Sequence, residues 1–162
     1  VEKALAASPT EDRKQRLLGL NAKVAIANAK VAYARFLEDL ASPRWQKLAA
    51  AGADPQLVLW ASTGTKDPAY SDVKYVEALI GPDTVNTLPP QTLAAYRQHG
   101  QPALRLETGL DMAQAMPAAL SELGIDLERA AAQLEEEGVQ KFIDAYDGLL
   151  ATLGQWRARN RQ

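Results

Sequence analysis

LVLWASTGTKDP, residues Leu57–Pro68, is the stretch that decides the fold class of this 162-residue chain. Leu57–Ala61 is apolar at every position, a pattern that is typical of a β-strand covered on both faces, as in a parallel sheet. A small polar loop, Ser62–Lys66, follows at once, and Asp67 and Pro68 are preferred residues for a helix start. This order of strand, loop and helix predicts one βα unit of an α/β protein.

A second short strand is predicted over Asp83–Leu88, between Gly81-Pro82 and Pro89-Pro90. The helical spacing of the apolar residues between the two strands predicts a connecting helix, so the strands at about 57–62 and 83–88 should be parallel. No further strand candidate is found, whereas a (β/α)₈ barrel has eight strands. We therefore expect an α/β chain that is part of a larger barrel, mostly helical with two short parallel strands.

The rest of the sequence is predicted to be helical. One helix is predicted over about 9–40, because this segment is rich in good helix formers, and Ser42-Pro43 is expected to end it. A C-terminal helical extension covers about 108–158, where Asp126 caps one segment and Gly138 is expected to break it from the next. The last segment carries a stripe of apolar residues at helical spacing: Val139, Phe142, Tyr146, Leu149, Leu153 and Trp156.

Composition limits the classes of function. Apolar residues make up 47% and charged residues 23%, as in an ordinary globular domain, and a net charge of −2 gives no footprint for nucleic acid or an anionic membrane. Cysteine is absent, which excludes disulfides and thiolate chemistry. His99 is the single histidine, so a histidine-rich metal site is not expected. Without a signal peptide or an apolar run of about 20 residues, a cytoplasmic location is expected.

The loop after the first strand has the composition of an anion site. Ligands of parallel α/β proteins bind beyond the carboxyl ends of strands, and the last loops of (β/α)₈ barrels often hold phosphate. Ser62 and Thr63 supply hydroxyl donors and Lys66 supplies positive charge, which suits a phosphate monoester. The P-loop spacing is missing, and the same residues also fit an ordinary turn whose hydroxyls cap backbone groups. Spacing alone leaves both interpretations open.

Asn86 and Thr87 leave the second predicted strand at the same end of the sheet as this loop. Their side chains could form hydrogen bonds with a polyol substrate, or they could satisfy backbone groups where the strand ends. We keep both residues as candidate substrate contacts.

Three long segments carry a resemblance to a known family. WASTGTKDPAYSDVKYVEALIGPDTVNTLPPQTL, residues Trp60–Leu93, resembles the C-terminal part of bacterial transaldolases. AKVAIANAKVAYARFLEDLASPRWQKLAAAGA, residues Ala22–Ala53, precedes it in the family's order, and LEEEGVQKFIDAYDGLL, residues Leu134–Leu150, follows. Together the three segments cover nearly the whole chain, which makes the match far more specific than any one motif.

The resemblance implies a (β/α)₈ barrel enzyme of the pentose phosphate pathway. Transaldolases transfer a dihydroxyacetone unit from sedoheptulose 7-phosphate to glyceraldehyde 3-phosphate. A lysine forms a Schiff base with the donor ketose, a neighbouring Asp and Glu move protons through a water, and no metal or organic cofactor is needed. The implied substrates are therefore sugar phosphates.

The resemblance also implies that the catalytic residues lie outside this chain. In transaldolases the Schiff-base lysine stands on the fourth strand, and the acid–base carboxylates also precede the matched region. We therefore expect strand seven at about 57–62, strand eight at about 83–88, the C-terminal helices, and no activity of the chain alone. Ser62 and Lys66 match the strand-seven motif that holds the substrate phosphate, although other transaldolases place an arginine in that loop.

Two strands taken out of a barrel would expose ladder edges and an apolar face. We expect the missing part of the barrel, self-association or helix repacking to cover them. Two other interpretations stay open. In the first, Lys66 is itself the Schiff-base amine of a small aldolase-like protein; in the second, the chain is a non-catalytic helical interaction module.

Overall fold

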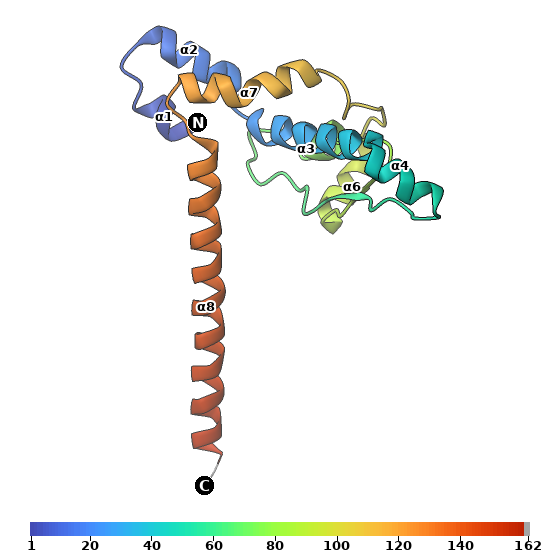
Figure 1. Ribbon diagram of the computed structural model, residues 1–162. Helices are drawn as coiled ribbons and strands as arrows, with labels where there is room; N and C mark the ends of the chain where they lie inside the picture. Colours follow the sequence, from blue (N-terminus) through green and yellow to red (C-terminus); the bar gives the residue numbers. More distant parts are fainter. Residues whose placement is uncertain (161–162) are drawn as a thin grey trace. The chain divides into compact units, whose positions relative to one another are not determined.

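The computed structural model describes residues 1–160 (Figure 1). Its elements in chain order are α1 Glu2–Ala6, α2 Glu11–Leu20, α3 Val24–Ala41, α4 Pro43–Ala50, β1 Val58–Trp60, α5 Lys74–Ala78, β2 Thr84–Asn86, α6 Pro90–His99, α7 Leu110–Glu122 and α8 Leu127–Arg159. The chain divides into two compact units, unit 1 covering Val1–Met116 and unit 2 beginning at Pro117. No helix within residues 1–160 combines the length and the apolar character needed to cross a membrane.

The sheet of unit 1 is the parallel pair predicted from the sequence. β1 and β2 align in register with Trp60 opposite Asn86. Both strands are shorter than the predicted ranges 57–62 and 83–88. The reason lies in the backbone: Ser62 has φ +58° and Asp83 has φ +53°, so the chain leaves the extended conformation just after β1 and just before β2.

One face of this sheet packs on the core of unit 1. Val58 and Trp60 contact a cluster of Tyr33, Leu79 and Leu106, whose side chains are at most 6% exposed. The other face carries the aligned pair Leu59 and Val85, which are 53% and 40% exposed. The prediction that the first strand is covered on both faces is therefore wrong for this chain. An exposed apolar face on a two-stranded sheet is instead what an incomplete barrel would present.

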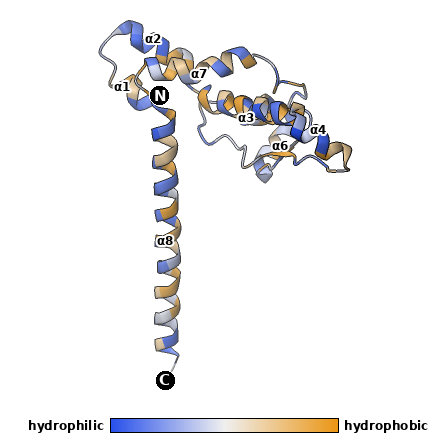
Figure 2. Cartoon of the chain, viewed as in Figure 1, coloured by the Kyte–Doolittle hydropathy of each residue, from blue (hydrophilic) through white to orange (hydrophobic). Residues whose placement is uncertain are grey.

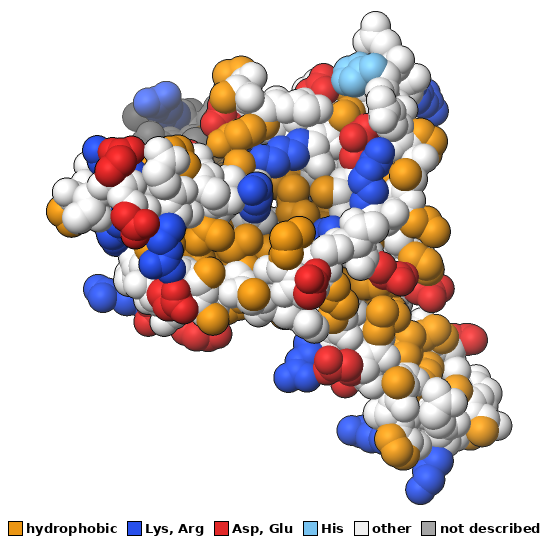
Figure 3. Space-filling model, turned by 90° about the horizontal axis from the view of Figure 1, so that it is seen from above, with side chains coloured by type: hydrophobic (Ala, Val, Ile, Leu, Met, Phe, Trp, Pro, Cys, Tyr) orange, Lys and Arg blue, Asp and Glu red, His pale blue; other side chains and the backbone are white. Residues whose placement is uncertain are grey.

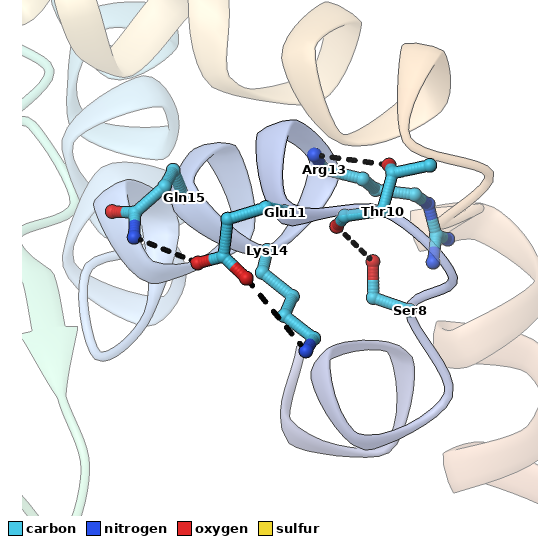
Figure 4. Close-up of polar contacts among 6 residues, drawn as sticks. All are labelled: Ser8, Thr10, Glu11, Arg13, Lys14 and Gln15. Carbon is cyan, nitrogen blue, oxygen red and sulfur yellow. Dashed lines mark hydrogen bonds and ion pairs between the residues drawn. The ribbon is translucent and has the colours of Figure 1, made fainter.

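Helix boundaries in unit 1 follow side-chain caps. Thr10 accepts a hydrogen bond from the backbone N–H of Arg13 and begins α2 (Figure 4). Within that helix Glu11 accepts a hydrogen bond from Gln15 (3.1 Å) and pairs with Lys14 (3.8 Å). Ser42 separates α3 from α4, as predicted, because its hydroxyl accepts a hydrogen bond from the N–H of Trp45 while Pro43 occupies the first helical position.

Two predicted boundaries in unit 1 are wrong. The helix expected over 9–40 is divided into α2 and α3 by Asn21–Lys23, where Ala22 adopts φ +60°. The helix expected to start at Asp67 starts at Lys74 instead. The Asp67 side chain accepts a hydrogen bond from the N–H of Ala69 at 2.9 Å, so it closes a local turn in place of capping a helix.

Unit 2 contains the long helix α8, which runs through Gly138 without interruption. The predicted break at Gly138 is therefore wrong, because one glycine costs about 1 kcal/mol in a helix whose neighbouring residues favour it. Asp126 caps α8 as predicted, accepting a hydrogen bond from the N–H of Arg129 at 3.1 Å. Figure 2 shows hydrophobic residues recurring along the whole length of α8.

Candidate functional site

The loops that follow β1 and β2 are joined by hydrogen bonds at the carboxyl end of the sheet. The backbone N–H of Ser62 donates to the hydroxyl of Thr87 at 3.0 Å. That hydroxyl in turn donates to the carbonyl oxygen of Trp60 at 3.3 Å, and the N–H of Thr87 donates to the same oxygen at 3.0 Å. The sequence prediction that the two loops emerge at one end of the sheet is thus confirmed.

Thr63 and Asn86 form a second link between the same loops. The hydroxyl of Thr63 donates to the side-chain oxygen of Asn86 at 2.7 Å, and Thr63 is only 7% exposed. The side-chain oxygens of Asn86 and Thr87 both accept hydrogen bonds from the first loop. In this structure they therefore join the ends of the two strands. Of the two uses considered from the sequence, hydrogen bonding at the strand ends is the one that the geometry favours.

Ser62 and Lys66 border a hollow of about 450 Å³ in unit 1. Segments far apart in the sequence meet there, since α1, the break between α2 and α3, the loop after β1, and α5 all contribute. The lining residues are Glu2, Asn21, Ala22, Ser62, Gly64, Thr65, Lys66, Asp67, Tyr70 and Tyr75. Both Ser62 and Lys66 are exposed. The structure therefore brings two of the predicted phosphate-binding residues together at one hollow, whereas Thr63 is buried and does not line it.

The loop beside this hollow contains backbone hydrogen-bond donors that are not used within the chain's described part. Within residues 1–160, the backbone N–H groups of Thr63, Gly64, Thr65 and Lys66 donate no hydrogen bond. Consecutive free N–H groups in a loop form a concavity that favours anions. The hydroxyl of Thr65 is buried and has no partner among the described residues.

Side chains of both positive and negative charge border the hollow. Lys66 contributes an ammonium group, whereas Glu2 and Asp67 contribute carboxylates. Charged side chains of both signs are likewise interspersed on the face of the molecule drawn in Figure 3. A phosphate in this hollow would be attracted by Lys66 and the free N–H groups and would be repelled by the two carboxylates.

Gly64 is required by close packing where the loop passes α6. A Cβ atom at this position would lie 2.9 Å from Cγ of Pro89 and 3.2 Å from the hydroxyl oxygen of Thr92. The loop can lie this close to α6 only because residue 64 has no side chain. The shape of the loop is therefore fixed by β2 on one side and by the start of α6 on the other.

Tyr70 and Asn21 are site residues that sequence reasoning did not select. The side-chain amide of Asn21 donates to the Tyr70 hydroxyl at 3.5 Å, and Nζ of Lys74 lies 3.7 Å from the centre of the Tyr70 ring. Asn21 lies at the break between α2 and α3, which was not predicted because the whole of 9–40 is rich in helix formers.

The lysine with a perturbed pKa lies away from this hollow. Burial lowers the pKa of Lys30, whose ammonium donates to the carbonyl oxygens of Arg105 and Thr108. These contacts tie α3 to the segment before α7, so Lys30 has a structural role. Among residues 1–160, no cluster of three or more His, Cys, Asp or Glu residues is arranged to hold a metal ion.

Parallel strands with a polar loop beyond their carboxyl ends define an α/β scaffold of the kind that binds ligands at that edge. Residues 4–153 match the family described as Transaldolase/Fructose-6-phosphate aldolase, and the chain belongs to this family of barrel aldolases. The resemblance drawn from the sequence is thus confirmed.

Curated relatives support the same assignment. The chain is 51% identical over 140 residues to a transaldolase of Thiobacillus denitrificans, an alignment that covers 86% of this chain and 39% of the relative. It is 48% identical over 142 residues to a transaldolase of Frankia alni, covering 87% and 38%. It is 42% identical over 155 residues to a transaldolase of Trichodesmium erythraeum, covering 94% and 41%. The chain thus spans about two fifths of the length of these relatives.

Proposed function

We propose that this chain is the C-terminal part of a transaldolase barrel, with β1 as strand seven, β2 as strand eight and α7 and α8 as the C-terminal extension. The observation that carries the proposal is the family match over residues 4–153 together with a parallel strand pair whose loops meet at the carboxyl edge. The parent enzyme would transfer a dihydroxyacetone unit from sedoheptulose 7-phosphate to glyceraldehyde 3-phosphate through a lysine Schiff base. The expected cytoplasmic location stays a prediction.

The role proposed for this chain is to hold the phosphate of the sugar. The Ser62 hydroxyl, the Lys66 ammonium and the free N–H groups of residues 63–66 would bind the phosphate oxygens. Thr63 would act through its N–H, because its hydroxyl is bonded to Asn86. Asn86 and Thr87 would position the loop, and they would reach a substrate only if these bonds opened.

The chain is proposed to be inactive alone and to need the preceding part of the barrel. That part would cover the exposed face of Leu59 and Val85, which faces away from the core cluster. The exposed edges of the two-stranded sheet would then pair with neighbouring strands.

Complementation tests the proposed parentage. The chain alone should show no transfer from sedoheptulose 7-phosphate to glyceraldehyde 3-phosphate, and addition of the preceding three fifths of the Thiobacillus denitrificans transaldolase should restore it. Borohydride reduction with sedoheptulose 7-phosphate should leave the label on the added segment. A label on Lys66 of the chain alone would instead identify a small Schiff-base aldolase and overturn the proposal.

Phosphate titration tests the proposed site. Inorganic phosphate should shift the amide NMR signals of residues 62–66, and Lys66→Met should weaken binding by about tenfold, as expected for a charged hydrogen bond. Lys47→Met, a matched change of an exposed lysine on α4, should leave binding unchanged. Asp67→Asn should strengthen binding by roughly twofold or more, since it removes a repelling carboxylate. Equal weakening by the two lysine variants, or no shift in the loop, would favour a non-catalytic interaction module.

A further inference from the structure

The side chain of Thr65 carries a hydroxyl oxygen that is buried and has no hydrogen-bond partner within residues 1–160. Such atoms are rare in folded proteins, and each requires a specific explanation. Trp60 has an indole nitrogen in the same situation, but its ring packs on the core cluster of unit 1. Thr65 instead borders the hollow beside the loop. The unpartnered hydroxyl therefore belongs to a residue of the proposed phosphate site.

Threonine carries its hydroxyl and its methyl group on the same carbon. The staggered positions about χ1 lie about 120° apart, so a single rotation moves the hydroxyl out of its buried place without movement of the backbone. A buried hydroxyl with no partner has lost the hydrogen bonds that it formed with water in the unfolded chain. The buried rotamer of Thr65 is therefore held only by packing, and a ligand that offers an acceptor can shift the side chain to another rotamer.

The two halves of the Ser62–Lys66 loop are held differently. Its first three residues are fixed by hydrogen bonds to the end of the second strand and by close packing against Pro89. In the second half, the side chain of Thr65 has no hydrogen bond and Lys66 forms no salt bridge within residues 1–160. The second half can thus adjust to a ligand while the first half keeps the loop in place.

Ser62 adds backbone strain at the start of the same loop. Its φ of +58° is unfavourable for a residue that has a Cβ atom, and such a conformation persists only where the surrounding structure imposes it. Here the N–H of Ser62 is bonded to the hydroxyl of Thr87 at 3.0 Å. Strained residues cluster at sites that bind ligands. The strain at Ser62 and the unpartnered hydroxyl of Thr65 both indicate a loop shaped for a ligand rather than for the stability of the free chain.

We propose that Thr65 is a further ligand-binding residue of this loop, and that its hydroxyl turns from its buried place to donate a hydrogen bond to an oxygen of the bound phosphate. This role rests on the proposed function, because it requires that the hollow beside the loop binds phosphate. It adds to Ser62 and Lys66 a donor that the sequence did not single out. The free chain bears the cost of the buried hydroxyl, and binding removes that cost, so Thr65 contributes to phosphate affinity.

Thr65→Val in the full 162-residue chain tests this role by two measurements with opposite expected signs. Valine has nearly the same shape without a polar atom, so the phosphate-free chain should gain stability, and its unfolding equilibrium constant in urea should fall by about fivefold or more. The same variant should bind inorganic phosphate about tenfold more weakly, as measured from the amide NMR shifts of residues 62–66. Thr65→Ser keeps the hydroxyl and should retain most of the phosphate affinity.

Thr63→Val is the matched control, because Thr63 is also buried but donates its hydroxyl to Asn86 at 2.7 Å. This variant should lose stability, since the Asn86 oxygen is left without its donor. If Thr65→Val loses stability as well, the Thr65 hydroxyl has a partner, such as a buried water, and the proposal is overturned. Unchanged phosphate affinity of Thr65→Val would also overturn it.

The rotation of the Thr65 side chain is measured directly by NMR. Three-bond couplings from its methyl carbon to the backbone nitrogen and carbonyl carbon report χ1, which should change to a different staggered value when phosphate is added. An unchanged χ1 in the phosphate-saturated chain would refute the proposed rotation. If Lys66→Met weakens phosphate binding and Thr65→Val does not, the role of Thr65 fails while the proposed phosphate site stands. If the wild-type chain binds no phosphate, the site and the role of Thr65 fail together.

Discussion

Leu106 offers the sharpest test of what holds unit 1 together. Its side chain is 1% exposed and packs in the cluster with Tyr33 and Leu79. A Cβ atom at Gly81 would lie 2.7 Å from Cβ of Leu106, so the leucine lies directly on the Gly81 backbone. Leu106→Ala would leave a cavity that Gly81, having no side chain, cannot fill. The expected loss in the free energy of unfolding is about 3–5 kcal/mol.

Hydrogen exchange followed by mass spectrometry measures this loss within unit 1. Amides of α3 and β2 should lose protection by about 100-fold to several-thousand-fold, because each 1.4 kcal/mol is a factor of ten. The loss cannot exceed the total stability of unit 1, so complete loss of protection is the strongest outcome. Leu104→Ala is the matched control, since Leu104 is 71% exposed and should change protection by less than about 0.5 kcal/mol. Equal effects of the two variants would refute the assignment of the core.

Three further predictions concern the loop and the core. Gly64→Ala should destabilise unit 1 by about 1–3 kcal/mol through its clash with Pro89 and shift the amide signals of the loop; unchanged signals and unfolding would contradict the close packing. Ser62→Gly should exceed Ser62→Ala in stability by about 1 kcal/mol in urea unfolding, because φ is +58° there, and equal stability would argue against this conformation. Burial, followed by the charges of Glu107 and Asp83, raises the pKa of Tyr33 above its usual 10.0, so the unfolded chain loses this proton first and stability should fall as pH rises above that value. Tyr33→Phe should show a shallower decline of the urea midpoint between about pH 9 and about pH 11, and an identical decline would exclude Tyr33 as its source.

The sequence predicted features that depend on neighbouring residues. The serine–proline boundary at Ser42 and the Asp126 cap could be inferred because each depends on a residue and its close neighbours, and the parallel pairing of β1 and β2 could be inferred from the helix predicted between them. The break at Gly138 could not be judged in this way. A glycine lowers helix stability by a roughly fixed amount, and whether the helix continues depends on the balance over the whole of α8.

The candidate site was predictable only in part. The loop residues Ser62 and Lys66 follow directly from their position after an apolar run. Thr63 stands in the same polar loop and was predicted for the same reason, yet its hydroxyl donates a hydrogen bond to Asn86 of the second strand. Asn21 joins the hollow because Ala22 has φ +60° and turns the chain between α2 and α3, a conformation that alanine does not signal. Contacts between distant segments therefore set which polar groups remain available.

The hydroxyl of Thr87 bridges the ends of both strands, and this has a practical consequence for protein engineering. The conformation of Ser62–Lys66 is imposed from outside by Thr87, Asn86 and Pro89. Transplanting those five residues onto another scaffold would not carry their shape with them. A successful graft would have to move the second strand end and the first turn of α6 as one cassette.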